Sequence, residues 1–426
     1  MAMVVFIVSL CFAMAIGIPI AFSLLFSGVA MMVHLDVFNT QILAQNLISG
    51  ADSFAMMAVP FFMLAGDLMN SGGLTKRIVK FALVAVGHIR GGLGYVAILA
   101  IIMFASLVGS AVASTAALGA ILIPMMVKAG YDRDRSTALI ASGNLLAPII
   151  PPSVPMIFFG VTAGVSISKL FMSGIVPGII IAIALAITWG IVSRKDKAQV
   201  LPKSSLKELF KAAIDAIWAL MMPLIIIIGM RGGIFTPTEA GVVAVVYSLF
   251  VGFFVYRELT LEALYKSLVS SAKTTSVVMF LAAAAMVSAW LMAIGNIPGL
   301  VSDILQPFIG NKILLMLVIN LIVVLVGTAM DVNPTILILT PVLMPIVKQA
   351  GIDPVYFGLV FVINNVIGLL TPPVGTVLNV ACGAGKISME RLIKAIMPFF
   401  IVECAILLLF ILFPQIVTIP LKFLTQ

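Results

Sequence analysis

Two stretches of the chain place polar and chain-breaking residues inside runs that are otherwise apolar. The first is Gly109–Thr115 and the second is Gly327–Thr335, which contains Asp331. A helix broken inside a membrane presents free amide donors, which suit a carboxylate, and free carbonyl oxygens, which suit a small hard cation. Lipid tolerates broken backbone only where protein buries it or where it lines a cavity. Each break is therefore a candidate binding site.

Two further breaks are rich in proline. Residues 148–155 hold four prolines, and residues 370–375 hold Pro372-Pro373. Proline removes a donor and clashes with the preceding helical turn, so backbone carbonyls are left free there. Asn144 and Asn365 each stand seven positions before a Pro-Pro pair.

We predict two Na⁺ sites, each between one polar break and the paired proline break. The first would use Ser106, Ser110, Asn144 and Ala147, and the second Gly327, Thr328, Gly368 and Thr371. The alternative is that these small residues only allow helices to pack closely.

Asp331 is the acidic residue inside the second polar break. An ionisable side chain at membrane depth is a functional candidate, although an aspartate before a helix also serves as an N-cap. Asp67 and Glu403 lie in apolar runs away from the breaks and are interpreted as structural. Glu239, in a Thr-Pro-Thr-Glu sequence, is typical of a helix start.

The chain matches itself when it is shifted by 221 positions without a gap. The matching residues are mostly helix breakers and loop residues, which fix special backbone positions. The pairs are Pro124 and Pro345, Gly130 and Gly351, Asp132 and Asp353, Asn144 and Asn365, Pro151 and Pro372, Gly164 and Gly385, and Pro177 and Pro398. The same register places Ser106, Ser110 and Ser114 opposite Gly327, Asp331 and Thr335. An internal duplication is the interpretation.

The composition indicates an integral membrane protein built from helices. Of 426 residues, 62% are hydrophobic and 9% are charged, and the mean hydropathy is +1.27; a soluble domain is about a quarter charged. The net charge of +8 is expected to mark cytoplasmic loops rather than a nucleic-acid surface. Three cysteines in apolar runs indicate neither a disulfide framework nor a metal site. No phosphate-binding loop is found, which excludes ATP as the energy source in this chain, and two histidines give no support for a hydrolase triad.

The apolar runs predict the order of the spans. Residues 4–33 are predicted to form one retained first span interrupted at residues 17–19, followed by a polar stretch at residues 34–53. Residues 74–89 mix basic and apolar residues and are predicted to lie at the interface. Residues 257–273 are predicted to be a second such segment, separate from a span at 274–294. The last helix is predicted to begin at Ala395.

The basic residues predict the orientation. If residues 93–127 and 312–345 are re-entrant hairpins and the loop from Arg194 to Lys211 is cytoplasmic, nineteen of the 24 Lys and Arg residues lie inside. Those left outside are Lys169, Arg231, Lys312, Lys348 and Lys422. The two hairpins then enter from opposite sides, which is an inverted-repeat arrangement.

Six segments in order resemble the large membrane subunit of a TRAP (tripartite ATP-independent periplasmic) transporter, of the DctM/SiaM type. They are residues 60–66, 109–124, 148–155, 235–241, 327–345 and 371–375, and the similarity covers nearly the whole chain. Sialic-acid-transporting members look closest overall, although no single residue carries that likeness.

The resemblance implies a Na⁺-driven importer of organic acids in the bacterial inner membrane, working by an elevator motion. It implies two partners, a small four-helix membrane subunit and a periplasmic substrate-binding protein. Substrate would lie between the two hairpin tips. The residues concerned are Ser110, Ser114, Ser153 and Asp331.

The expected fold is an all-α polytopic membrane protein with inverted repeats, two re-entrant helical hairpins and two broken helices. The expected division has scaffold helices and an interfacial arm at 1–92, and the first transport repeat at 93–193. A cytoplasmic loop, scaffold helices and a second arm follow at 194–300, and the second transport repeat at 301–426.

Other functions stay open at this point. A carboxylate or ion transporter of the same architecture could work without a binding protein. A channel would need a continuous polar path, against which the occluding hairpins argue. An intramembrane enzyme would need a base beside a serine, and neither His34 nor His88 can be placed there.

Overall fold

The computed structural model describes residues 1–196, 198, 202–372 and 374–425, without the side chains of residues 106–108. Lys197, Pro373 and the side chain of Ser106, which the predictions above use, therefore lie outside the described part. The regular elements formed by the described residues are all helical. Seven helices are long and apolar enough to cross a membrane, or eight if one bent pair counts as a span. The predicted all-α polytopic membrane fold is confirmed.

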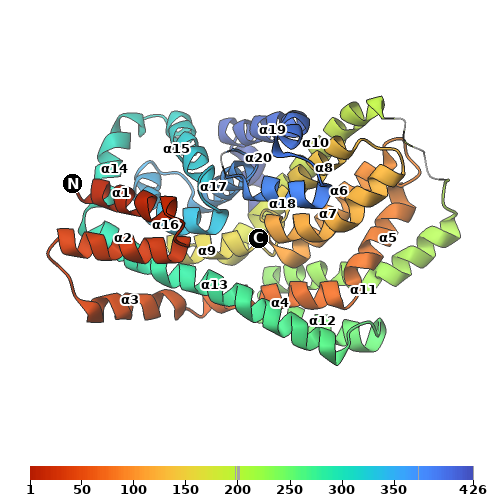
Figure 1. The fold of residues 1–426 in the computed structure, drawn as a ribbon, viewed down its shortest axis with the longest axis horizontal. Coiled ribbons are helices and arrows are strands. Elements are labelled where there is room, and N and C mark those ends of the chain that lie inside the picture. The colour runs from red at the N-terminus through yellow and green to blue at the C-terminus, as the bar shows by residue number, and fades with distance from the viewer. Residues whose placement is uncertain (197, 199–201, 373, 426) are drawn as a thin grey trace.

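The first half of the chain contains ten α-helices (Figure 1). They are α1 (Ala2–Ala15), α2 (Ile20–His34), α3 (Thr40–Ala51), α4 (Ala58–Ser71), α5 (Leu74–Val86), α6 (Gly92–Val108), α7 (Ala111–Lys128), α8 (Arg133–Gly143), α9 (Val154–Ala163) and α10 (Ile167–Val192). Short 3₁₀ turns, η1 (Ala55–Met57), η2 (Asn144–Leu146) and η3 (Ser193–Lys195), precede α4, follow α8 and follow α10.

The second half begins at Leu206. Its helices are α11 (Leu206–Arg231), α12 (Pro237–Phe250), α13 (Leu261–Ile294), α14 (Ile297–Leu305), α15 (Lys312–Gly327), α16 (Val332–Gln349), α17 (Pro354–Gly368), α18 (Thr376–Gly385), α19 (Met389–Leu412) and α20 (Gln415–Thr425). A π-helical turn, η4 (Val251–Val255), extends α12, and a 3₁₀ turn, η5 (Gln306–Phe308), follows α14.

The register of 221 residues also relates the helices. Both α7 and α16 fit it at both ends, since Ala111 and Val332 begin them and Lys128 and Gln349 end them. The starts of α8 and α17 are also 221 positions apart, and each is capped by the aspartate that the sequence comparison paired. Asp132 accepts a hydrogen bond from the Arg135 amide, and Asp353 accepts from the Val355 and Tyr356 amides. Aspartate caps that lie 221 positions apart therefore begin both helices.

Helix packing follows the same relation. Helix α7 of the first half packs against α18 of the second, and α16 packs against α9, which are the same two contacts with the halves exchanged. Likewise α8 packs against α19, and α17 against α10. Such reciprocal contacts are what an approximate two-fold relation between the halves would produce. Most of these helices gather in the upper part of Figure 1.

An aromatic cluster joins the two halves. The ring of Phe159 on α9 lies 6.0 Å from the ring of Phe357 and 5.9 Å from that of Phe361, both on α17. Gly358 makes room for it, because a Cβ at that position would lie 2.3 Å from the Phe159 ring. The cluster is fully buried and joins the two halves by apolar packing. An ion pair of 2.9 Å between Arg391 on α19 and Asp134 on α8 also joins them.

Several predicted boundaries are wrong. Residues 4–33 do not form one span, because α1 and α2 turn at Gly17, where φ is +85°, and pack against each other. The polar stretch at 34–53 contains helix α3, which begins at an Asn39 cap and meets α4 at a bend of 56°. In both places a single local residue, the turn glycine Gly17 or the cap Asn39, sets the helix boundary. The average hydropathy of the segment does not indicate that boundary.

The C-terminal half of the chain also departs from expectation. The two segments predicted at 257–273 and 274–294 are one continuous helix, α13, of 34 residues. No proline or glycine interrupts residues 261–294, so a change of polarity does not end the helix. The last predicted helix begins six residues earlier than Ala395, at Met389, and α20 follows it.

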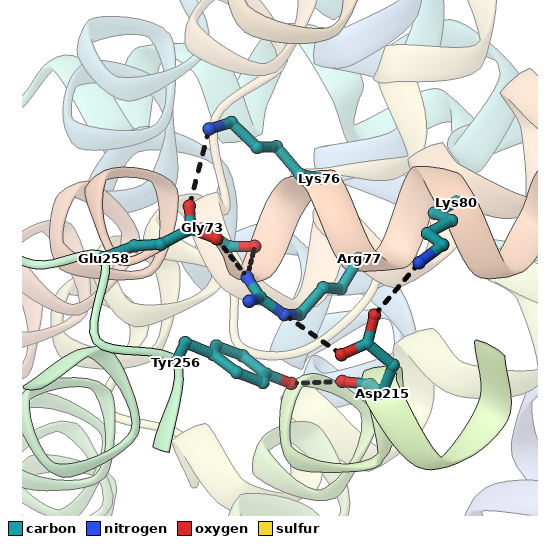
Figure 2. Close-up of polar contacts among 7 residues, drawn as sticks. All are labelled: Gly73, Lys76, Arg77, Lys80, Asp215, Tyr256 and Glu258. Atoms are coloured by element: carbon teal, nitrogen blue, oxygen red, sulfur yellow. Dashed lines mark hydrogen bonds and ion pairs between the residues drawn. The ribbon is translucent and has the colours of Figure 1, made fainter. Parts of the chain in front are cut away.

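Helix α5 is linked to Asp215 on α11 and to Glu258 by a cluster of ion pairs centred on the partly buried Arg77 (Figure 2). Arg77, whose side chain is 17% exposed, bonds the Glu258 carboxylate at 2.8 Å and pairs with Asp215 at 3.5 Å. Its guanidinium lies 3.6 Å from the centre of the Tyr256 ring. Burial raises the pKa of Glu258, but the hydrogen bonds and charges of Arg77 and Lys76 together outweigh it, so the pKa lies below its usual value. The predicted interfacial helix is thus fixed to α11 and to the segment that precedes α13.

Candidate functional site

The first polar break meets the first proline-rich break. Helix α6 ends at Val108, Gly109 adopts a φ of +63°, and Ser110 caps α7. A Cβ on Gly109 would lie 3.0 Å from the Pro152 carbonyl oxygen and 3.3 Å from the Val154 amide nitrogen. The tip therefore sits directly on the start of α9, and the N-terminal ends of α7 and α9 come together there.

The second polar break meets the second proline-rich break in the same way. A Cβ on Gly368, at the end of α17, would lie 3.1–3.2 Å from backbone atoms of Gly327, at the end of α15. The Val374 amide donates to the Thr328 carbonyl oxygen over 3.3 Å. The predicted pairing of each tip with its proline-rich break is thus found in both halves.

Each junction contains a buried asparagine with a free acceptor. The amide nitrogens of Asn144 and Asn365 donate to the carbonyl oxygens four residues earlier, Ile140 and Phe361. Their amide oxygens are buried and have no hydrogen-bond partner in the described protein. A Cβ on Gly327 would lie 3.7 Å from the Asn365 oxygen. A buried acceptor without a donor calls for water or a cation.

Besides Asn144, the predicted ligands of the first cation site are Ala147, Ser110 and Ser106. Ala147 is buried, and its amide donates to the Asn144 carbonyl over 3.1 Å. Ser110 accepts from the Ala113 amide over 3.4 Å, which is a long hydrogen bond, and the residue is partly exposed. Of the four residues predicted for this site, three are described and Ser106 is not.

The predicted ligands of the second cation site lie at the junction of α15 and α17. Gly327 and Gly368 are in direct contact, as described above. The hydroxyls of Thr328 and Thr371 donate to carbonyl oxygens of their own helical turns, those of Leu325 and Ile367. A hydroxyl that donates in this way keeps its oxygen lone pairs available to a cation.

The residues predicted to touch substrate are helix caps or first-turn residues. Ser153 caps α9, accepting from the Met156 amide and donating to the Pro148 carbonyl. Ser114, in the first turn of α7, is fully buried, and its hydroxyl has no partner among the described atoms. Within the described residues, no hydrogen bond joins Asp331 to Ser110, Ser114 or Ser153.

Asp331 occupies the position in α16 that Ser110 occupies in α7. One carboxylate oxygen accepts from the Val332 amide over 2.8 Å, so the side chain is an N-cap, as the alternative interpretation required. A carboxylate has two oxygens, and capping uses one of them. The helix cap and a role at the site are therefore compatible.

Three polar residues, Asn365, Asn333 and Glu403, were not selected as site residues from the sequence. Asn365 lies beside Gly327 and was not among the residues predicted for the second cation site, although its match to Asn144 in the 221-residue register was a usable signal. The amide oxygen of Asn333, beside Asp331, is also buried without a partner. Glu403, interpreted as structural, is 3% exposed, and neither of its oxygens has a partner in the described protein. No sequence pattern distinguished these two from ordinary helix residues.

The arrangement offers neutral oxygen ligands and helix N-termini. The described residues contain no group of three His, Cys, Asp or Glu that could hold a metal ion, so the ligand set is not of the transition-metal kind. Amide, hydroxyl and backbone oxygens suit an alkali cation. The N-termini of α7, α9 and α16 carry positive partial charge, which suits a carboxylate.

The family model described as "Tripartite ATP-independent periplasmic transporter, DctM component" matches residues 7–416. The chain is 51% identical over 422 residues to the 2,3-diketo-L-gulonate TRAP transporter large permease protein YiaN of Escherichia coli, with 99% of each chain covered. It is 38% identical to the sialic acid TRAP transporter large permease protein SiaM of Vibrio cholerae, covering 94% and 93%.

Two further similarities concern chain organisation and fold. The isethionate TRAP transporter permease protein DctMQ of Oleidesulfovibrio alaskensis is 38% identical, and the match covers 95% of this chain but 64% of that one. The crystal structure of the Alcanivorax borkumensis YdaH transporter, described as having an unusual topology, aligns with a TM-score of 0.66 over 88% of each chain. At 14% sequence identity this likeness concerns the fold alone.

Proposed function

Because this chain belongs to the DctM-component family of tripartite ATP-independent periplasmic transporters, we propose that it is a Na⁺-coupled importer. At the coarser level it is a multi-pass permease of the bacterial inner membrane that transports organic acids, and it is not an enzyme. The proposal adds the coupling ion, the ion sites and the class of acid.

The observation that carries Na⁺ coupling is the pair of equivalent asparagines. Asn144 and Asn365 each present a buried, unpartnered amide oxygen where a polar break meets a proline-rich break. An unsatisfied buried acceptor costs about 1–3 kcal/mol, and a cation bound there would remove that cost. Two such positions support two Na⁺ ions, one in each repeat.

The proposed substrate is a sugar acid. The relative that transports 2,3-diketo-L-gulonate is 51% identical, against 38% for the sialic acid relative. This moves the expected substrate away from sialic acid and toward a smaller hydroxylated carboxylate. The helix N-termini near Ser110 and Ser153 would receive the carboxylate, and Asp331 would accept hydrogen bonds from hydroxyls, since two carboxylates repel.

The proposed partners follow from the family description as one component of a tripartite system. A small membrane subunit would join this chain in the membrane, as the combined DctMQ name of the isethionate relative suggests. A periplasmic binding protein would deliver the acid. The two tips would move with the bundle that holds them, as an elevator, relative to the helices tied by Arg77.

Uptake into proteoliposomes tests the proposal. The permease and its small subunit are reconstituted, and labelled diketogulonate is offered with its binding protein under an inward Na⁺ gradient. Replacing Na⁺ by choline should reduce initial uptake at least tenfold, whereas collapsing a proton gradient should leave it unchanged. Equal initial uptake in choline and in Na⁺ would contradict the proposed Na⁺ coupling.

The same vesicles address the alternative, a transporter of this architecture that needs no binding protein. The similarity of fold to YdaH keeps that alternative under test. Uptake that is unchanged when the binding protein is omitted would favour it. Uptake that appears only with the binding protein supports the tripartite system.

A further inference from the structure

A basic pocket lies beside the start of α11, away from the helix breaks. Its volume is about 520 Å³, and its walls come from α5, the segment 202–204 and the first turns of α11. The charged residues that line it are Lys80, Lys203, Glu208 and Lys211. Val84 and Ala212 supply apolar wall.

The lysines of this pocket are available to a ligand. Among the residues that the structure describes, neither Lys203 nor Lys211 has an ion-pair partner. Lys80 contacts Asp215 only at 3.4 Å, and its side chain is 60% exposed. The acid of the pocket, Glu208, is engaged in the capping box with Ser205. The pocket therefore contains two lysines without a described ion-pair partner and a third, Lys80, that is paired with Asp215 but largely exposed.

The pocket opens where lipid head groups are expected. Helix α11 has 26 residues, which at 1.5 Å per residue is about 39 Å, longer than the roughly 30 Å hydrocarbon layer. Its first turns therefore extend into the head-group region, on the side that the basic-residue count assigns to the cytoplasm. Phe210 and Ile214, four residues apart on one face, are 69% and 53% exposed beside the pocket.

We propose that this pocket binds the phosphate of an anionic phospholipid of the inner membrane. The lysines would pair with the phosphodiester, and the acyl chains would lie along the exposed face at Phe210 and Ile214. That apolar face beside the charges favours a lipid over a free anion. Since Lys80 also contacts Asp215, which Arg77 holds, a bound lipid would brace the junction of α5 and α11.

Lipid retention by the purified full-length protein tests this site without any transport assay. The protein in a neutral detergent is titrated with phosphatidylglycerol, with phosphatidylcholine or with inorganic phosphate, and bound lipid is counted by native mass spectrometry together with the melting temperature. The test variant is Lys203→Gln with Lys211→Gln. The control is Lys266→Gln with Lys273→Gln, which removes the same charge from α13.

Phosphatidylglycerol should bind and raise the melting temperature of the wild type and of the control. The test variant should bind it about 30-fold more weakly, about fivefold for each lysine. Phosphatidylcholine and inorganic phosphate should do neither. Equal binding of phosphatidylcholine, unchanged binding by the test variant, or equal stabilisation by inorganic phosphate would each overturn the proposal. None of these results depends on Na⁺ coupling.

Discussion

At the scale of residues, the proposed Na⁺ sites rest on Asn144 and Asn365. Each uses its amide nitrogen on its own helix, four residues back, and leaves its oxygen free in the core. Asn46 on α3 makes the same bond to Ile42 but is far from either break in the sequence. Asn46 is therefore a matched control for losing the hydrogen bond from an asparagine amide to its own helix backbone.

Asn365→Ala should remove one neutral ligand from the proposed second Na⁺ site. We expect the Na⁺ concentration that gives half-maximal uptake to rise by about tenfold, which corresponds to about 1.4 kcal/mol of binding free energy. Asn144→Ala should have a similar effect on the first site. The measurement is uptake against Na⁺ concentration in proteoliposomes. Asn46→Ala should leave the curve in place; a shift equal to that of Asn365→Ala would assign the effect to the helices.

Substitutions can distinguish the capping role of Asp331 from the role of its charge. Asparagine caps a helix about as well as aspartate, whereas alanine costs about 1 kcal/mol. Asp331→Asn should therefore keep the melting temperature of the wild type but reduce uptake at least tenfold. Asp331→Ala should lose both. If Asp331→Asn transports at the wild-type rate, the carboxylate serves only as a cap. Ser110→Ala, at the equivalent cap, should likewise impair uptake in a protein that remains folded.

At the scale of elements, the second junction depends on two helix ends that approach each other backbone to backbone. The ends of α15 and α17 touch through Gly327 and Gly368. The approach requires glycine at Gly368, because a Cβ there would lie 3.1–3.2 Å from the Gly327 backbone, whereas a Cβ on Gly327 would meet its neighbours at an ordinary 3.7–3.8 Å. Gly383 on α18, in the same repeat, faces nothing within 4 Å and is a natural control.

Gly368→Ala should push α15 from α17, because the new Cβ would meet the Gly327 backbone at 3.1–3.2 Å. We expect reduced uptake and a weaker response of the melting temperature to Na⁺. Gly383→Ala should change neither. The two variants are compared by thermal melting with and without Na⁺, and a wild-type Na⁺ response in Gly368→Ala would show that the contact is not required.

The arm formed by α5 should depend on Arg77. Arg77→Ala removes two ion pairs and the ring contact, which we expect to lower the free energy of unfolding by about 1–3 kcal/mol. Lys76→Ala should cost less than about 0.5 kcal/mol, since Lys76 is 77% exposed and 3.4 Å from Glu258.

The stabilisation that the Arg77 ion pairs provide should depend on pH. Because the pKa of Glu258 is lowered in the folded protein, its contribution is complete above its ordinary pKa and is lost as pH falls through the lowered value. The stability difference between wild type and Arg77→Ala should narrow in acid. A difference that stays constant down to the most acidic tolerated pH would exclude Glu258 as the partner that matters.

At the scale of the whole molecule, the exchange of contacts between α7·α18 and α16·α9 relates two halves of one chain. The basic-residue count predicts that these halves face opposite sides of the membrane. Lys128 and Gln349 are the last residues of α7 and α16, are equivalent in the register, and are both exposed. They therefore form a matched pair for labelling.

Lys128→Cys and Gln349→Cys, each in a background lacking Cys11, Cys382 and Cys404, should react from opposite sides. An impermeant maleimide applied to intact spheroplasts should label Gln349→Cys, and labelling of Lys128→Cys should require inside-out vesicles. Labelling of both from one side would show that the repeats are not inverted.

The sequence by itself determined the fold class, the breaks and their pairing. Long apolar runs, prolines and glycines act locally, so they carry this information wherever the chain folds. The same is true of the caps at Ser110, Asp132, Asp331 and Asp353, each found at the position the register required. The resemblance of six segments was likewise sufficient for the family.

Only the tertiary structure decided which oxygens at the breaks lack partners. The amide oxygens of Asn144, Asn333 and Asn365, like those of Asn320 and Asn364, are buried without a described donor, and both properties depend on neighbours distant in the chain. It also decided that α1 and α2 fold back on each other and that α13 continues through a change of polarity. Average hydropathy cannot settle these points, because packing against other helices determines where a turn forms and which polar groups are satisfied.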